Sequence, residues 1–181
     1  MLGTVVLASS ACSSQSLTVA EYAEAIEGAT RDYISESQVL SATFHKTVED
    51  AVAHIVESGG DDPLTRATEV TVREMMLYFV LLEDAMAGYL ARLNAVEAPN
   101  RLRGSHAAYM GAVSSVHASM PALLSSIEFA HDLGAVQAAI AGSGFQDGQH
   151  RWTETCLSLE SAVRGEGTGV DLGCTRSQET P

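Results

Sequence analysis

A long run of apolar residues at three- and four-residue spacing, from Leu64 to Leu93, most constrains what this chain can fold into. Residues at this spacing share one face of an α-helix, which has about 3.6 residues per turn. The apolar face widens over MMLYFVLL, as in the most buried helix of a bundle. The pattern predicts a helix from Pro63 to a point before Pro99, whose stripe contains Leu64, Thr68, Val72, Met75, Phe79, Leu82, Met86, Leu90 and Leu93.

A second amphipathic helix is predicted upstream of this one. Thr18 and Glu21 have the spacing of a capping box, in which each side chain bonds to a backbone amide of the other residue. Apolar residues then recur at helical spacing as far as Ile55, and the segment from Ser35 to Ser37 is a point where the helix could break. The sequence SGGDDP ends it, and Asp62 is expected to cap the helix that follows.

Two more helices follow Pro99. Asn100 is the predicted cap of the third, which carries the stripe Leu102, His106, Tyr109, Val113, Val116, Met120, Leu123 and Ile127. Pro121 lies inside that pattern, so we expect a kink or a restart there. The segment 131–148 is expected to be a weak helix that fades into a loop. The last helix is predicted from about Gln149 to Arg164, with Trp152, Cys156, Leu159 and Val163 on one side.

These helices predict an all-α fold. No segment alternates apolar and polar residues for long enough to indicate a sheet. Four long helices joined by short turns favour an antiparallel four-helix bundle. The glycine-rich segment GEGTGVDLGCTRSQETP is expected to form an irregular C-terminal tail.

The composition limits the classes of partner. Apolar residues make up 46% and charged residues 18% of the 181 residues, as in a globular domain. The net charge of −13 repels polyanions, so nucleic acid and anionic lipid head groups are excluded as direct ligands.

The first twenty residues carry no charge, and Cys12 follows an apolar segment and three small residues in MLGTVVLASSACSSQS. A secretory signal has a cationic start, an apolar run of about 7–15 residues and a small-residue cleavage site. The last two features are present in shortened form, and the first is missing. Two interpretations stand: an ordinary N-terminus with a thiol at Cys12, or the end of a lipoprotein signal.

The sequence SSAC followed by SSQS resembles the cleavage motif and polar tether of bacterial lipoproteins, although Ser9 stands where that family prefers leucine. The resemblance implies that Cys12 is the lipid-modified N-terminus. Residues 1–17 are then a signal remnant and tether, and residues 18–181 are a bundle domain outside the cytoplasmic membrane. Such a domain meets the membrane only through its lipid.

Setting Cys12 apart leaves the pair Cys156 and Cys174. The pair could be two buried thiols in a cytosolic protein or a disulfide in an exported one. Together with the leader, the even pair favours export and a disulfide. That bridge would pin the tail to the last helix and stabilise the fold by about 3 kcal/mol.

Two further segments, EAPNRLRGSHAAYMGAV and CLSLESAV with the later VDLGC, resemble uncharacterised small helical bacterial lipoproteins. This resemblance implies a fold and a location, and it brings neither a function nor a cofactor.

Few residues have the spacing of a reactive site. Glu128 and His131 form one E-x-x-H, whereas a ferritin-like di-metal centre needs two. His106 and Met110 could bind a soft metal, but such residues are more often structural. No G-x-S-x-G motif is present, and GEGTG lies after a helix rather than before one. We therefore assign no catalytic, cofactor or metal residue.

The sequence favours an extracytoplasmic, membrane-tethered helical bundle that binds an unidentified protein or small molecule and is not an enzyme. The alternative is a bundle that binds or senses a small ligand or metal ion, with the ligand held between the second and third helices.

Overall fold

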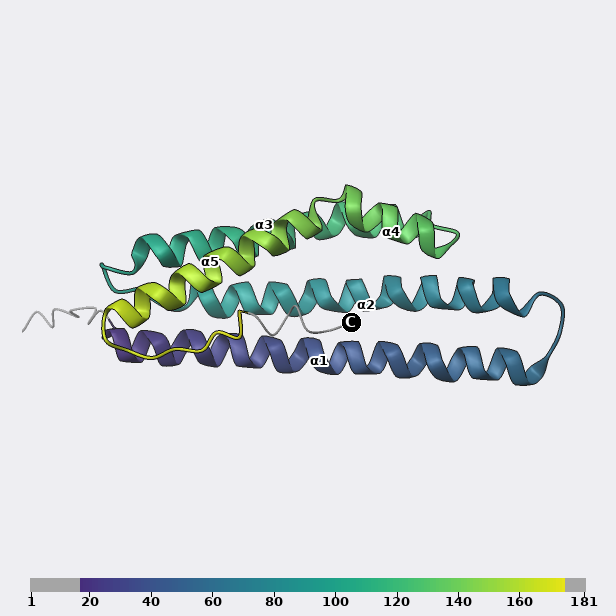
Figure 1. Ribbon diagram of the computed structural model, residues 1–181, viewed down its shortest axis with the longest axis horizontal. Helices are drawn as coiled ribbons and strands as arrows, with labels where there is room; N and C mark the ends of the chain where they lie inside the picture. The colour runs from purple at the N-terminus through teal and green to yellow at the C-terminus, as the bar shows by residue number, and fades with distance from the viewer. Residues whose placement is uncertain (1–16, 175–181) are drawn as a thin grey trace, which may run out of the picture.

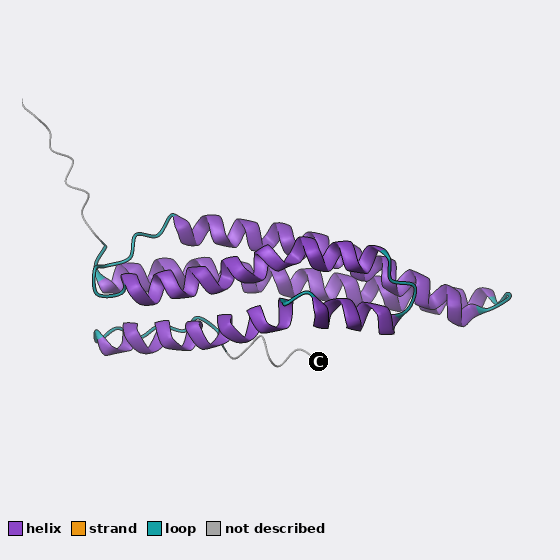
Figure 2. Cartoon of the chain, turned by 90° about the horizontal axis from the view of Figure 1, so that it is seen from above, coloured by secondary structure: helices purple, strands orange, loops and turns teal. Residues whose placement is uncertain are grey.

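The structure is a computed structural model that describes residues 17–174, so the predicted lipidation site at Cys12 lies outside the described residues. The described chain is all-helical and contains five helices, the four long helices predicted and a short one in the segment where a weak helix was expected. They are α1 (Val19–Ser58), α2 (Pro63–Asn94), α3 (Arg103–Glu128), α4 (Leu133–Gly142) and α5 (Phe145–Gly165). The short helix, α4, forms the first part of the segment expected to be a weak helix that fades into a loop, and Figure 2 shows the loops that separate the helices.

The helices pack as two pairs. The long helices α1 and α2 run in opposite directions and form a hairpin, and α3 packs along α5 (Figure 1). Contacts between α2 and α3 join the pairs, and α4 packs against α3 and α5 at the turn between them. The far end of the α1–α2 hairpin extends past the other helices (Figure 1).

The helix ends follow local sequence chemistry. The Thr18 hydroxyl accepts a hydrogen bond from the Glu21 amide at 3.2 Å, and Oε2 of Glu21 accepts one from the Thr18 amide at 2.9 Å, so the capping box is present. Asp62 caps α2 by accepting from the Thr65 amide at 3.2 Å. The predicted cap at Asn100 is wrong, because α3 begins at Arg103 after a turn and has no side-chain cap.

Three expected interruptions are absent or displaced. Helix α1 continues through Ser35 to Ser37, where the Ser37 hydroxyl donates to the Ile34 carbonyl at 2.9 Å. Helix α3 continues through Pro121 without a restart. Helix α5 begins at Phe145 rather than near Gln149, because Gly144 adopts a left-handed φ of 75° that turns the chain into the helix.

Much of the core comes from the predicted stripes, although the buried residues Tyr89, Val136 and Phe145 lie outside them. Buried residues include Phe79, Leu82, Met86 and Leu93 of α2, and Tyr109, Val113, Val116, Met120, Leu123 and Ile127 of α3. Leu64 is an exception, since it lies on the extended end of the hairpin and is 77% exposed. Helices α3 and α5 approach each other closely at Gly148, where an added Cβ atom would lie 3.0 Å from Cγ2 of Val116.

Candidate functional site

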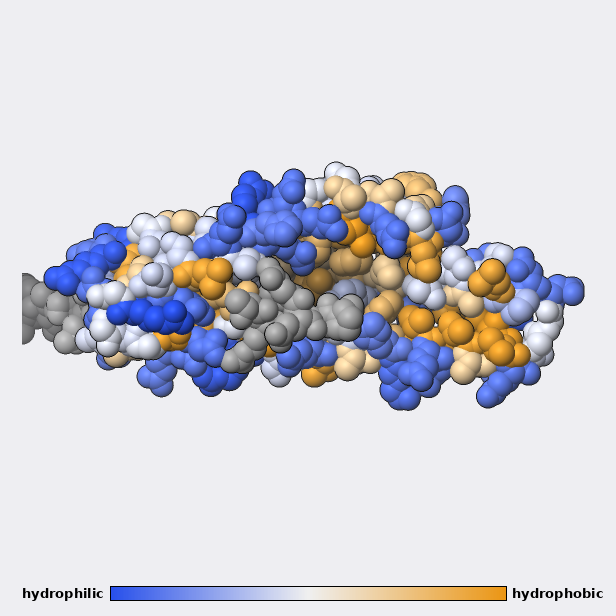
Figure 3. Space-filling model, viewed as in Figure 1, coloured by the Kyte–Doolittle hydropathy of each residue, from blue (hydrophilic) through white to orange (hydrophobic). Residues whose placement is uncertain are grey.

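A groove of about 900 Å³ lies between α1 and α5. It forms because α1 packs on α2 and α5 packs on α3, which leaves the seam between α1 and α5 open. Figure 3 shows a hollow between the two helices, with apolar atoms at its base and hydrophilic atoms along the rims. Volumes of about 300–1,000 Å³ are typical of ligand-binding clefts.

The two walls are polar and uncharged. Helix α1 contributes Ser37, Gln38, Ser41 and His45, and α5 contributes Gln146, Gln149, His150 and Thr153. The described lining includes no aspartate, glutamate, lysine or arginine, although the chain carries 23 acidic and 10 basic residues. The groove is thus a neutral, hydrogen-bonding cleft in an acidic protein.

The base of the groove is apolar and aromatic. Tyr78 and Leu82 of α2 lie at one part of it, and Tyr33 and Trp152 at another. The ring centroids of Tyr33 and Trp152 are 5.6 Å apart, and those of Tyr33 and Tyr89 are 4.7 Å apart in a stacked arrangement. Trp152 is only partly buried, so part of its indole ring remains accessible to a ligand.

Beneath these rings, three helices share a chain of buried hydroxyl groups. The Thr30 hydroxyl lies 2.8 Å from the Tyr89 hydroxyl, which makes a short hydrogen bond with the Tyr109 hydroxyl. Burial raises the pKa of Tyr33, Tyr89 and Tyr109 above the ordinary value for tyrosine. These phenols therefore stay protonated at neutral pH and serve as hydrogen-bonding groups rather than as bases.

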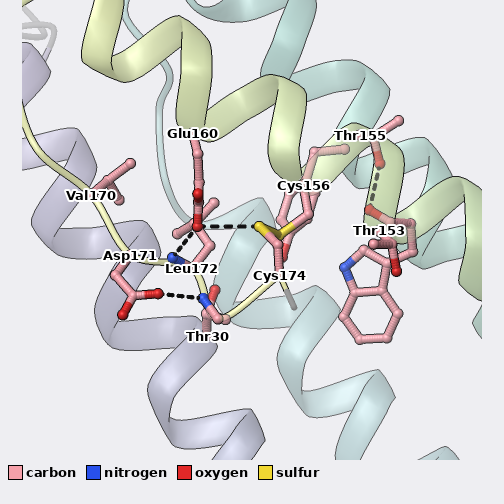
Figure 4. Close-up of a disulfide and its surroundings, with 12 residues drawn as sticks. Thr30, Thr153, Thr155, Cys156, Glu160, Val170, Asp171, Leu172 and Cys174 are labelled. Carbon is pink, nitrogen blue, oxygen red and sulfur yellow. Dashed lines mark hydrogen bonds between the residues drawn. A yellow bond between two sulfur atoms is a disulfide. The ribbon is translucent and has the colours of Figure 1, made fainter. Parts of the chain in front are cut away.

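The C-terminal tail closes one end of the groove. The residues Leu172, Gly173 and Cys174 line it, and Cys174 is joined to Cys156 of α5 by a disulfide with the Cα atoms 5.6 Å apart. This separation lies within the usual reach of a disulfide, about 4.4–6.8 Å. Figure 4 shows the bridge beside Glu160 of α5.

Glu160 fixes the tail in place through hydrogen bonds. Its Oε1 accepts a hydrogen bond from the Leu172 amide at 2.8 Å, and its Oε2 pairs with Nη2 of Arg164 at 2.9 Å. Sγ of Cys174 lies 3.2 Å from Oε1, which is a contact only, because a disulfide sulfur carries no proton. The buried carboxylate is thus satisfied by the tail it holds.

The structure places His131 outside the helix that holds Glu128, and it gives His106 a hydrogen-bond partner on α1. Glu128 is the last residue of α3 and His131 lies in the following loop; both are exposed, so they do not share a helix face. Nδ1 of His106 lies 3.0 Å from the Tyr22 hydroxyl of α1. Within residues 17–174, no three His, Cys, Asp or Glu side chains gather where they could hold a metal ion.

The sequence analysis did not predict the groove between α1 and α5. Its alternative ligand site lay between the second and third helices. The wall residues of the groove occur as ordinary polar positions on the outer faces of two helices. Gln38 and Ser41 on α1 and Gln149 on α5 are far apart in the chain, and a single sequence gives no signal that they face each other.

Comparison with protein-family models, with curated proteins and with solved structures finds no match for this chain. In residues 17–174, no helix combines the length and apolar character needed to cross a bilayer.

Proposed function

We propose that this protein is a non-catalytic binding module whose binding site is the groove between α1 and α5. The observation that carries the proposal is the uncharged lining: polar walls and an aromatic base within an otherwise acidic surface. A charged ligand would lose its hydration there without gaining an opposite charge. The site therefore suits an uncharged, amphipathic ligand.

The groove residues support binding more than catalysis. Among the described residues, the lining contains no carboxylate or amine, and both of its cysteines are in the disulfide. Its tyrosines are kept protonated by burial. His45 and His150 remain, one on each wall, without a carboxylate in the lining to orient them as a general base would require.

The architecture we propose for this module is an antiparallel four-helix bundle of α1, α2, α3 and α5, in which α4 is an insertion in the α3–α5 turn. The disulfide-pinned tail lies beside α1 and α5 and defines one end of the groove.

The module is further proposed to lie outside the cytoplasmic membrane, anchored by a lipid on Cys12. This part of the proposal is supported by the leader SSACSSQS and by the even cysteine pair. In a bacterial host given labelled fatty acid, a chain with a restored basic signal start should be labelled, and its Cys12→Ser variant should not. Equal labelling of the two, or none, would refute the anchor.

The groove itself is tested with a neutral fluorescent dye, N-phenyl-1-naphthylamine, and the full chain carrying Cys12→Ser. Trp152 is the single tryptophan, so energy transfer from it reports dye bound in the groove. We expect dye fluorescence to rise on binding and the tryptophan emission to fall.

A matched pair of variants on α1 tests the location. Ser41→Phe places a ring in the groove and should weaken dye binding about tenfold or more, a loss of about 1.4 kcal/mol. Ser35→Phe places the same ring on the exposed face outside the lining and should leave binding unchanged. Absence of dye binding, or equal effects of the two variants, would contradict the proposed site.

A further inference from the structure

We propose that the groove binds an extended, uncharged peptide segment of a partner protein, laid along the α1–α5 seam in continuation of the chain's own tail. This inference rests on the proposed function, because it names the ligand class of the same groove.

The tail shows what the seam accepts. Residues Val170 to Cys174 have no helical structure and lie between α1 and α5 (Figures 1 and 4). Val170 and Leu172 are buried, whereas Asp171 between them is exposed. Over Val170 to Leu172 this alternation is that of an extended chain, in which successive side chains point to opposite sides, and a left-handed φ of 62° at Gly173 then turns the chain. The seam therefore already holds an extended peptide with its apolar side chains directed inward.

The seam also provides partners for a peptide backbone. Oε1 of Glu160 accepts the Leu172 amide, which shows that a side chain on α5 can satisfy the main chain of a segment in the seam. Farther along, the carboxamides of Gln38, Gln146 and Gln149 line the groove. Each carboxamide both donates and accepts hydrogen bonds, as a peptide group does. The walls are thus suited to a main chain rather than to one fixed charged group.

The dimensions indicate a short segment. On α1 the lining extends from Thr30 to His45, which corresponds to about 22 Å at a rise of about 1.5 Å per residue. An extended chain rises about 3.3 Å per residue, so about six or seven residues would span the whole lining, of which Leu172, Gly173 and Cys174 of the tail already occupy one end.

The groove also selects the side chains of the segment. Because the lining is uncharged, an inward-facing charged side chain would be desolvated without a counter-charge. Away from the tail, α5 diverges from α1 (Figure 1), and Tyr78 and Leu82 of α2 contribute to the lining. That part fits a bulky apolar side chain. The expected ligand is a short uncharged peptide with apolar residues at alternate positions.

The test is selection from a random heptapeptide library displayed on phage, against the full oxidised chain carrying Cys12→Ser. Selected peptides are then synthesised with blocked ends and without tryptophan, and binding is followed by Trp152 fluorescence and by displacement of the naphthylamine dye. We expect uncharged sequences with alternating apolar residues. Aspartate at an inward position should weaken binding about tenfold, and at an outward position less than about twofold. Ser41→Phe should abolish binding, and Ser35→Phe should not.

Each other outcome overturns the inference in a recognisable way. If the dye binds and no peptide does, the groove is a site for small molecules and only the peptide inference fails. If neither binds, the proposed function fails as well. Peptides without alternation, or insensitive to Ser41→Phe, would place their binding elsewhere. Peptide binding that appears only after removal of residues 175–181 would assign the groove to the chain's own C-terminal residues.

Discussion

The hydroxyl groups of Thr30 on α1 and Tyr89 on α2 lie 2.8 Å apart in the buried centre of the protein. Thr30 also donates to the Ile26 carbonyl at 2.9 Å, so Tyr89 donates to Thr30 while accepting from Tyr109 of α3. This chain of hydroxyl groups gives the buried phenols of Tyr89 and Tyr109 their partners and links three helices beneath the groove.

Replacement of Tyr89 by phenylalanine should lower the free energy of unfolding by about 1–3 kcal/mol, because the buried Tyr109 hydroxyl loses its acceptor. Urea denaturation of Tyr89→Phe would measure this. Tyr78→Phe is the matched control, because Tyr78 is only partly buried, and its effect should be smaller. Equal losses for the two variants would argue against the network.

Gly148→Ala should destabilise the protein although alanine favours helix more than glycine does. The new Cβ would lie 3.0 Å from Cγ2 of Val116, and α3 and α5 would have to move apart. Overpacking of this kind costs about 1–3 kcal/mol. The control is Gly111→Ala on α3, where a Cβ meets nothing within 4 Å, and it should stabilise the protein by about 0.5–1 kcal/mol. Thermal or urea unfolding would show whether each variant raises or lowers the free energy of unfolding. If Gly148→Ala leaves it unchanged, α3 and α5 are less closely packed at this position than the structure shows.

Loss of the disulfide should lower the free energy of unfolding by about 3 kcal/mol, since it closes a loop of 18 residues in the unfolded chain. The comparison is between the oxidised chain and a variant with both Cys156→Ser and Cys174→Ser, unfolded in urea. Dithiothreitol should lower the stability of the first to that of the second and leave the second unchanged. A reductant effect on the variant would point to a different cause.

Stability should fall as the pH drops below about 6.5 because of His106. Burial lowers the pKa of His106 from its ordinary value of 6.5, so the unfolded chain binds a proton at a pH where the folded chain does not. In the interval between the folded and unfolded pKa values, stability therefore rises with pH. The free energy of unfolding measured from pH 7 to pH 5 should decline more steeply for the wild type than for His106→Gln. Parallel curves would show that His106 contributes nothing to this dependence.

The helices and most of the core were predictable from the sequence because helical periodicity is local. The spacing from Val72 to Leu93 places the buried face of α2, and Thr18 and Glu21 mark the start of α1, through contacts between residues three or four positions apart. Where the local signal was weak, tertiary packing determined whether a segment is helical. Helix α4 forms where it packs against α3 and α5. Helix α1 remains helical through Ser35 to Ser37.

The groove could not be predicted in this way, because it depends on which neighbouring helices do not pack closely against each other. Gln38 and Gln149 face one groove only because α1 packs on α2, α5 packs on α3, and the tail occupies part of the seam between them. The sequence alone determined the helices and their apolar faces through interactions along each helix. Only the tertiary structure decided that two polar faces, distant in the chain, form the walls of one uncharged cleft, because that depends on side-chain packing between helices.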